Sequence, residues 1–371
     1  MQVTPALDSG GVETLTVEMA GAVVSAGARS LVASHGGALE GELARDGAEL
    51  IRMPVQARDP LTMAANAIRL ERVIRREAVS LLHVRSRAPA FSALWAARRV
   101  GVPLVSSYHG IYAARSPMKR WYNSVMTRGD AVIVNSAFTR EHVLAQHRPP
   151  ADKVELIPEG VDPTRFDPAA VSAERVQRTR EAWGVDNNRI LILLAARLTG
   201  WKGHRLIISA LAASTGREKA RLVFVGGDRE SPYAVELAEQ AARCGVQLIL
   251  AGPSNDMAAA LLAADLVVAP STEPESFGRT VAEAGAMARV VLASHLGGPA
   301  ETILHGVTGF LAPAGDQQAW TATLDLALAL SPTERAAIGA AARERIRTFY
   351  STERMCEATF ALYRRLIRSD S

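Results

Sequence analysis

The sequence predicts an α/β protein built from two doubly wound domains. The chain has 371 residues, 48% of them hydrophobic, and is longer than the size at which one hydrophobic core usually stops growing. Aromatic residues make up only 5% while alanine, leucine and valine abound, which suits helices packed on parallel sheets. Short apolar runs recur along the chain, each followed by a small-residue turn and an amphipathic stretch, as an alternation of strands and helices requires.

The first half contains five apolar runs of strand length. The segment 1–4 precedes the Gly10-Gly11 turn and is either a short first strand or a misplaced start. Because the later runs are almost continuously apolar, we expect parallel strands that are covered on both faces. These strands are predicted at residues 30–34, 81–84, 104–107, 131–134 and 154–157.

The second half repeats the scheme and ends in a helix. Between the halves, residues 158–163 and the charged segment 169–183 predict the hinge. We expect a first domain over 1–165, a second over 166–350, and a C-terminal helix within 351–371 that crosses back to the first domain. The second-half strands are predicted at 190–195, 222–225, 248–251, 266–269 and 290–293, with helices such as 233–243 between them.

Composition and charge exclude several classes of protein. A formal net charge of +4 is too mild for a nucleic-acid binder but suits a phosphate-bearing ligand. Cys244 and Cys356 are the two cysteines, and their separation fits neither a disulfide framework nor a zinc site. The sequence shows neither an apolar run of membrane-spanning length nor a signal-peptide pattern, so we expect a cytoplasmic protein.

A basic loop follows the strand at 190–195. Arg197 and Lys202 lie five residues apart on it, just before a helix. The planar guanidinium can hold two phosphate oxygens and the ammonium supplies a compact charge, so together they suit a diphosphate. The alternative is a solvated surface turn.

A second loop follows the strand at 266–269 and carries Glu275. The helix 279–287 is expected to begin near Phe277, so that backbone N–H groups of Phe277, Gly278 and Arg279 form an anion site. Glu275 could then accept hydrogen bonds from sugar hydroxyls, while Glu283 could reach a ribose. The alternative is that both acids only stabilise the start of the helix.

These residues carry a resemblance to a known family. The segment from Glu275 to Glu283 matches the E-x7-E pattern of retaining glycosyltransferases of the GT-B fold, and the chain resembles family 4 of the nucleotide-sugar glycosyltransferases, in particular bacterial lipopolysaccharide-core and glycolipid enzymes. Further similar segments follow in the same order: Gly10-Gly11-Val12-Glu13, Tyr108-His109-Gly110, Ile157-Pro158-Glu159-Gly160-Val161-Asp162, Arg197 with Lys202, Gly297-Gly298-Pro299-Ala300-Glu301 and Gly306-Val307-Thr308-Gly309-Phe310-Leu311.

The resemblance implies two Rossmann-like domains facing a central cleft, and it assigns roles to residues. Arg197 and Lys202 would bind the donor phosphates, Glu275 the transferred sugar and Glu283 the ribose. The implied catalytic residues are His109, Arg197, Lys202 and Glu275, and the implied donor-binding residues are Gly10, Gly11, Arg197, Lys202, Glu275, Ser276, Phe277, Gly278, Thr280 and Glu283. Two residues depart from the family pattern: Ala196 replaces the usual glycine before the basic loop, and Arg279 is larger than the usual aliphatic residue.

The expected function is retaining transfer of a hexose from a UDP- or GDP-sugar to a glycan or glycolipid, in lipopolysaccharide or other cell-envelope synthesis. We expect neither a cofactor nor a metal, because no Asp-x-Asp follows a strand to hold Mg²⁺. The alternatives are a nucleotide-sugar epimerase and a non-catalytic sugar-nucleotide-binding protein. A dehydrogenase is excluded, since no G-x-G-x-x-G is followed by an acid about 20 residues later.

The segment 112–128 mixes cations with aromatic residues. It would suit a peripheral protein on the inner face of the cytoplasmic membrane, with Trp121 and Tyr122 at the level of the lipid headgroups. The alternative is an ordinary amphipathic helix in which Trp121 and Val125 pack inward while Lys119, Arg120 and Arg128 face water. Other arginines, in the pairs Ser86-Arg87 and Arg98-Arg99, are predicted to lie on the surface, and Gly226-Gly227-Asp228 to form a turn or to border the base pocket.

Overall fold

The computed structural model describes residues 1–8, 10–112, 114, 116–185 and 189–369, which form two compact α/β units. Unit 1 comprises Met1–Gly160 together with Thr352–Ser371, and unit 2 comprises Val161–Ser351. Each unit contains its own parallel sheet, so the predicted fold class is confirmed.

The sheet of unit 1 has seven strands in the order β3-β2-β1-β4-β5-β6-β7. The strand order reverses between β1 and β4, which makes the sheet doubly wound. Every neighbouring pair is parallel, for example Val105 opposite Ala131. The strands are β1 (Gln2–Val3), β2 (Leu31–Ser34), β3 (Glu49–Arg52), β4 (Leu82–Val84), β5 (Leu104–Tyr108), β6 (Ala131–Val134) and β7 (Val154–Leu156).

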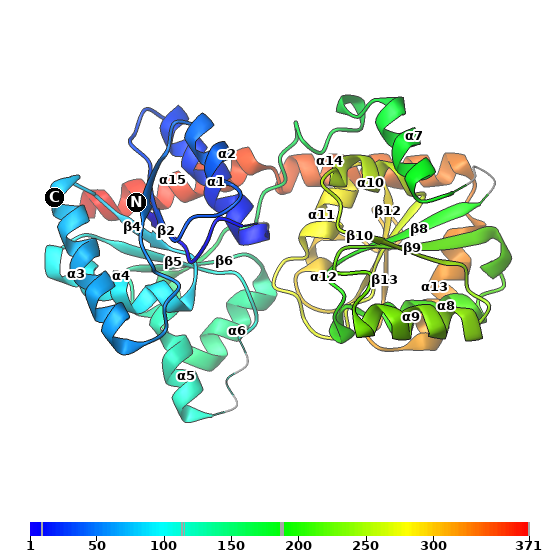
Figure 1. The fold of residues 1–371 in the computed structure, drawn as a ribbon, viewed down its shortest axis with the longest axis horizontal. Coiled ribbons are helices and arrows are strands. Elements are labelled where there is room, and N and C mark those ends of the chain that lie inside the picture. Colours follow the sequence, from blue (N-terminus) through cyan, green and yellow to red (C-terminus); the bar gives the residue numbers. More distant parts are fainter. Residues whose placement is uncertain (9, 113, 115, 186–188, 370–371) are drawn as a thin grey trace. The chain divides into compact units, whose positions relative to one another are not determined.

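Helices cover both faces of this sheet (Figure 1). On one face, Leu15 and Met19 of α1 pack with Met355 and Leu362 of α15, the C-terminal helix. On the other face, α3 and α4 bury small and aliphatic side chains against the strands. The helices of unit 1 are α1 (Gly11–Ser25), α2 (Glu40–Arg45), α3 (Pro60–Arg76), α4 (Arg87–Val100), α5 (Pro117–Asn123), α6 (Ala137–His147) and α15 (Thr352–Ser369), with short 3-10 turns at Ser124–Thr127 and Ala151–Lys153.

The sheet of unit 2 has six parallel strands in the order β10-β9-β8-β11-β12-β13. They are β8 (Ile190–Ala195), β9 (Ala220–Val225), β10 (Leu248–Gly252), β11 (Leu266–Ala269), β12 (Val290–Ser294) and β13 (Phe310–Ala312). Trp320 of α13 is fully buried and packs with strand residues on one face of the sheet. The helices are α7 (Ala173–Ala182), α8 (His204–Ala213), α9 (Pro232–Arg243), α10 (Met257–Ala263), α11 (Arg279–Ala286), α12 (Pro299–Thr302), α13 (Gln317–Ala329) and α14 (Pro332–Phe349).

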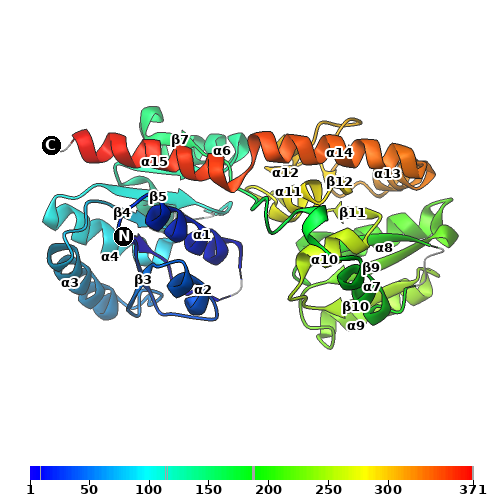
Figure 2. The ribbon, with the colours of Figure 1, turned by 90° about the horizontal axis from the view of Figure 1, so that it is seen from above.

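Several predictions about these elements are confirmed and others are wrong. The predicted strands 131–134, 190–195 and 266–269 coincide with β6, β8 and β11, and the C-terminal helix packs on α1 within unit 1 (Figure 2). Strands β3 and β13 were not predicted. The charged segment 169–183 was predicted as part of the hinge, but it lies within unit 2 and contains α7, which packs on α10.

Two predicted helices also differ from the structure. Helix α11 spans Arg279–Ala286, close to the predicted range 279–287, but it does not begin as early as Phe277, because Gly278 adopts a left-handed conformation with φ +88° as its N-cap. The segment 112–128 does not form one amphipathic helix. It contains the seven-residue α5 and then a 3-10 turn, while residues 113 and 115 lie outside the described residues.

Candidate functional site

The basic loop of unit 2 lies directly against the loop that follows β11. Gly203 ends the basic loop with φ +77°, and a Cβ there would lie 1.9 Å from the backbone oxygen of Pro270. Only glycine permits this approach. The backbone N–H of Thr272 donates to the oxygen of Trp201 at 2.7 Å, which ties the two loops together at the carboxyl ends of β8 and β11.

Lys202 and Glu275 form an ion pair across these loops. The Nζ of Lys202 lies 2.7 Å from Oε2 of Glu275, and the two side chains are only 16% and 17% exposed. The hydroxyl of Ser271 donates to the other carboxylate oxygen. The ammonium also lies 4.3 Å from the centre of the Trp201 ring. Both charges are therefore held in place by several partners.

Glycines hold the backbone of Glu275. The N–H of Gly298 donates to the oxygen of Glu275 at 2.9 Å. A Cβ on Gly297, whose φ is +72°, would lie 2.4 Å from that oxygen, and one on Gly298 would lie 2.3 Å from the oxygen of Ser276. The Gly297-Gly298 pair is thus required for the loop to pass this close to the E-x7-E segment.

The N-terminus of α11 completes this cluster. A cavity of about 20 Å³ is lined by Lys202, Ser271, Glu275, Gly278 and Thr280, among others. The hydroxyl of Thr280 donates to the oxygen of Ala195 at 3.1 Å, which fixes the first turn of α11 to the end of β8. The first turn of a helix carries backbone N–H groups that have no acceptor within the helix, and its dipole favours anions.

The remaining predicted donor residues are placed as follows. Glu283 lies in the second turn of α11, where Arg279 is its partner at 3.3 Å, and Phe277 is buried in the core. Arg197 is exposed and does not line the cavity, so the structure does not bring it into the Lys202–Glu275 cluster. Gly226 has φ +113°, and a Cβ there would lie 2.5 Å from the oxygen of Ala196, so the Gly226-Gly227 turn packs beneath the basic loop.

In unit 1, Gly10 and Gly11 start the helix α1. Gly10 is its N-cap in an extended conformation, and its oxygen accepts from the N–H of Thr14 at 3.0 Å. Both glycines are exposed. The N-terminus of this fifteen-residue helix favours an anion, and the two glycines carry no side chains that would cover its backbone there.

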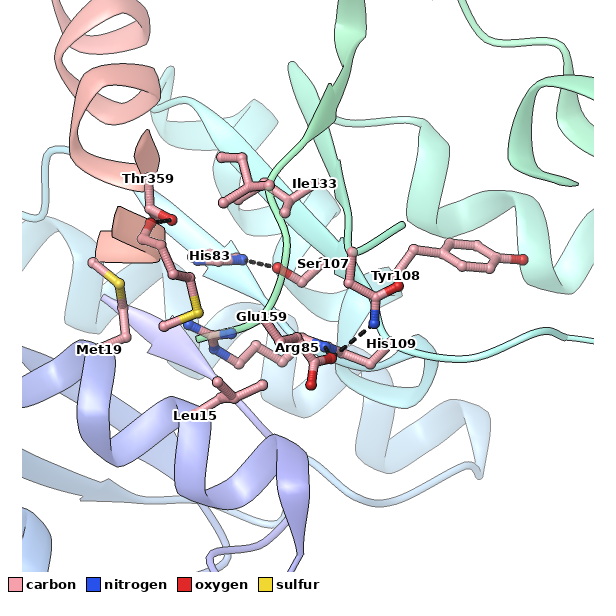
Figure 3. A pocket seen from close by; sticks show the side chains of 13 residues that line it. Leu15, Met19, His83, Arg85, Ser107, Tyr108, His109, Ile133, Glu159 and Thr359 are labelled. Carbon is pink, nitrogen blue, oxygen red and sulfur yellow. Dashed lines mark hydrogen bonds and ion pairs between the residues drawn. The ribbon is translucent and has the colours of Figure 1, made fainter. Parts of the chain in front are cut away.

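Four polar side chains lie just after neighbouring strands of unit 1: Arg85 after β4, His109 after β5, Asn135 after β6 and Glu159 after β7. They line one cavity of about 20 Å³ (Figure 3). The carboxylate oxygen Oε1 of Glu159 lies 3.0 Å from Nδ1 of His109 and accepts from Nδ2 of Asn135 at 2.8 Å.

The same cavity is bordered by a buried histidine of β4. The ring of His83 contacts the hydroxyl of Ser107 at 2.6 Å (Figure 3). Its other nitrogen lies 2.5 Å from the hydroxyl of Tyr363. Burial lowers the pKa of His83 well below its usual value, with a smaller contribution from Arg85. His83 is therefore neutral at pH 7, and it joins β4, β5 and α15 by hydrogen bonds.

Sequence reasoning missed Arg85, Asn135, Glu159 and Ser271 as candidate site residues. The pattern that could have found them is simple, because each follows the end of a parallel strand, where ligands of such sheets bind. Arg87, which was predicted to lie on the surface, is only partly exposed. It donates to Oδ1 of Asn123 at 2.7 Å and lies 3.9 Å from the centre of the Tyr112 ring, whereas Arg98 and Arg99 are exposed.

The described part of the chain contains neither a candidate metal cluster nor a candidate membrane-spanning helix. No group of three or more His, Cys, Asp or Glu side chains there could hold a metal ion. None of its helices combines the length and the apolar composition needed to cross a membrane. Cys244 and Cys356 are free thiols.

Comparisons with known proteins identify the family to which this fold and its cluster of charged groups belong. Residues 9–165 match the model of Glycosyltransferase Family 4, and residues 176–345 match that of Glycosyl transferases group 1. A solved glycosyltransferase from Rickettsia africae is 30% identical, with a TM-score of 0.90 over 100% of this chain and 98% of that one. The chain belongs to the glycosyltransferases.

Other relatives are more distant or longer. A D-inositol 3-phosphate glycosyltransferase from Xylanimonas cellulosilytica is 33% identical over 68% of this chain and 64% of its own length. The aligned part thus spans less than two thirds of that curated relative. The structure of HepE from Anabaena, solved with UDP and glucose, is 23% identical with a TM-score of 0.84 over 99% of this chain and 100% of that one, which shows the same GT-B fold.

Proposed function

We propose that the protein is a retaining, metal-independent glycosyltransferase that moves a hexose from a UDP- or GDP-sugar to a glycan or glycolipid acceptor. The observation that carries the proposal is the Lys202–Glu275 pair, 2.7 Å apart in a cavity at the carboxyl ends of β8 and β11. A cation, a carboxylate and a helix N-terminus together suit the two parts of a nucleotide sugar, the diphosphate and the sugar hydroxyls.

In this mechanism the bond between the anomeric carbon and the diphosphate breaks while a bond to an acceptor oxygen forms. Lys202, Arg197 and the start of α11 would stabilise the negative charge that develops on the leaving diphosphate. Glu275, held by Ser271, would accept hydrogen bonds from the sugar. The departing phosphate would take the acceptor's proton, so that attack and departure occur on the same face of the sugar and its configuration is retained.

The roles of Glu283 and His109 also belong to this proposal. Glu283 would bind the ribose, with Arg279 as the partner that holds its carboxylate. His109 would lie beside the sugar, and Gly10 and Gly11 would bring the N-terminus of α1 to the phosphates. Further donor-binding contacts would come from Ser276, Phe277, Gly278 and Thr280, on the same loop and helix start.

The acceptor is proposed from chemistry and from relatives. A curated relative is named for D-inositol 3-phosphate, so a phosphorylated polyol is one class to test, and a lipopolysaccharide core is the other. UDP conjugates are the first donors to try, because a protein of the same fold was solved with UDP and glucose.

The experiment combines binding with product analysis. A thermal-shift screen with UDP, GDP and ADP and their hexose conjugates first identifies the nucleotide, since a ligand that binds only the folded state raises the unfolding midpoint. Transfer is then measured with both acceptor classes, and NMR of the product gives its anomeric configuration. Inversion would refute the retaining mechanism. An epimerised nucleotide sugar without transfer, or tight binding without turnover, would refute the transferase.

We also propose that unit 1 binds an anionic membrane surface on the cytoplasmic side. Met118 is 79% exposed and Trp121 is 58% exposed, so Trp121 does not pack fully inward. The centre of the Trp121 ring nevertheless lies 5.6 Å from the centre of the Phe91 ring and 5.0 Å from Cζ of Arg128. Lys119 is exposed on the same short helix. Exposed apolar side chains beside cations are typical of peripheral membrane proteins.

Vesicle co-sedimentation tests this surface. Binding to anionic vesicles at low salt should exceed binding to neutral ones and weaken as salt rises, because lipid charge is screened. Trp121→Ala should reduce it, whereas Leu326→Ala, an exposed leucine of unit 2, should not. Equal, negligible binding to both vesicles would remove the membrane proposal and leave the transferase untouched.

A further inference from the structure

Glu159 occupies a special position at the edge of the unit 1 sheet. It follows β7 and is the second-last residue of unit 1 before the chain enters unit 2. Its backbone is anchored on both sides: the N–H of Ile157 donates to Val134 at 2.9 Å, and the N–H of Gly160 lies 3.3 Å from Sδ of Met355. The carboxylate is therefore presented from a fixed stretch of chain.

The carboxylate of Glu159 contacts the imidazole of His109. Nδ1 of His109 and Oε1 of Glu159 are 3.0 Å apart, and both side chains are only 8% exposed. The amide of Asn135 donates to the same oxygen at 2.8 Å. An ionised carboxylate can only accept hydrogen bonds, so the proton between these two atoms belongs to Nδ1 of His109.

A buried arginine provides the charge that a buried carboxylate needs. Arg85 is 5% exposed and lines the same cavity. Burial lowers the pKa of Arg85, and the charge of Glu159 is among the contributions that counteract this lowering. The Nε of Arg85 donates to Oε1 of Gln2 at 2.7 Å, and the amide of Gln2 donates to the oxygen of Thr16 on α1 at 3.0 Å. Arg85 is thus fixed by β1 and α1, and its charge favours the ionised form of Glu159.

A histidine held in this way has one ring orientation and one proton position before any substrate arrives. The same logic orients catalytic histidines in other enzymes, where a buried carboxylate fixes the tautomer. We propose that Glu159 is a positioning residue, which acts on glycosyl transfer through His109 by holding its imidazole with Nδ1 protonated. This inference rests on the proposed role of His109 beside the sugar.

A double-mutant cycle tests whether Glu159 acts through His109. Glu159→Gln keeps the shape but loses the charge that specifies the proton position. In the wild-type background it should lower kcat by about 10- to 100-fold, as expected for a misplaced catalytic group. In a His109→Ala background the same change should alter kcat by less than about twofold, because the imidazole through which Glu159 acts on transfer is gone. Nucleotide affinity should stay unchanged in all variants, because neither Glu159 nor His109 is proposed to bind the nucleotide.

The control is Glu155→Gln. Glu155 lies on β7 four residues earlier, and its partner is Arg365 on the surface of unit 1. This variant should keep the wild-type kcat. Thermal midpoints establish that all variants fold, and Glu159→Asp serves as a second variant with the charge retained, expected to recover part of the loss. Equal losses in both backgrounds, or no loss in the wild-type background, would overturn the proposal.

A spectroscopic measurement separates this inference from the proposed function. The ¹⁵N chemical shifts of the His109 ring should show a proton on Nδ1 in the wild type and a change in Glu159→Gln. If no donor supports transfer by the wild type, the proposed function fails, and these shifts alone decide the positioning. An imidazole protonated only on Nε2 in the wild type would overturn it.

Discussion

Replacing Lys202 or Glu275 by alanine should abolish most transfer without unfolding the protein. Each change breaks the 2.7 Å pair and leaves its partner with fewer contacts: Glu275 keeps the Ser271 hydroxyl, and Lys202 keeps the Trp201 ring. Removing one preorganised group that stabilises developing charge typically costs about 10²- to 10³-fold in kcat, or about 3–4 kcal/mol. We therefore expect transfer to fall by roughly 10²-fold or more in each variant.

The loss in the free energy of unfolding should be smaller than the loss in transition-state stabilisation. The two side chains are only 16% and 17% exposed, so solvent screens the charge that is left behind only weakly, but that charge keeps one partner, and the cost should be about 1–3 kcal/mol. For a unit of this size, 1 kcal/mol shifts the unfolding midpoint by about 2–4 °C. A drop of roughly 2–12 °C would leave the protein folded at assay temperature.

The assay is steady-state kinetics with the donor identified by thermal shift. Arg243→Ala is the matched control, because Arg243 and Glu239 form an exposed pair 3.6 Å apart in the same unit. It should leave kcat and the midpoint unchanged. Turnover close to that of the wild type in folded Lys202→Ala or Glu275→Ala would refute the assignment of the donor site.

Three further predictions follow from single features of the structure. Gly203→Ala should lower the unfolding midpoint and weaken donor binding, because its Cβ would meet the backbone oxygen of Pro270 at 1.9 Å. Gly245→Ala, also at positive φ, should cost only the strain of its φ, because its Cβ would lie 3.8 Å from the flexible side chain of Arg217. Equal effects of the two changes would contradict this. EDTA should leave most transfer activity in place. Loss of activity with EDTA and its recovery with Mg²⁺ or Mn²⁺ would show that transfer requires a metal ion. Burial lowers the pKa of His204 to about 4 from its usual 6.5. The neutral ring therefore contributes stability above pH 6.5 that is lost as the pH falls towards 4, about 3 kcal/mol in all. His204→Leu should flatten the fall of the unfolding midpoint between pH 7 and pH 5, and an unaltered slope would refute this.

Apolar runs predicted most of the strands, including the edge strands β7 and β10, but failed for β3 and β13. Strands β6, β8 and β11 are central, so every position along them is apolar and their limits could be predicted. Strand β3 lies at an edge of its sheet and reads Glu-Leu-Ile-Arg, with both ends exposed, and β13 has only three residues. An edge or very short strand does not need an apolar run, so this signal is absent there.

The two halves of the candidate site differed in how far the sequence could predict them. Lys202 and Glu275 were predicted to lie near one crevice, and the structure brings them into contact; the sequence could not show that Ser271 holds the carboxylate or that Arg279 is the partner of Glu283. Glu159 was visible only as part of a hinge motif. Its contact with His109 joins residues fifty positions apart, through the order of strands β5, β6 and β7.

The charges around the donor cavity explain why an exposed Arg197 is compatible with a phosphate-binding role. Lys202 is neutralised by Glu275, and Arg279 lies beside Glu283, so these two pairs contribute little net positive charge to the cavity. A diphosphate brings negative charge next to Glu275 and must be compensated from elsewhere. The start of α11 provides a partial positive charge, and Arg197, on the same loop as Lys202, provides a full one. A long side chain left in water until the ligand arrives avoids the desolvation that an unpaired buried cation would suffer. Lys202 and Ser271 hold the carboxylate of Glu275, which is proposed to bind the sugar, while Arg197 would supply the charge that a bound nucleotide requires.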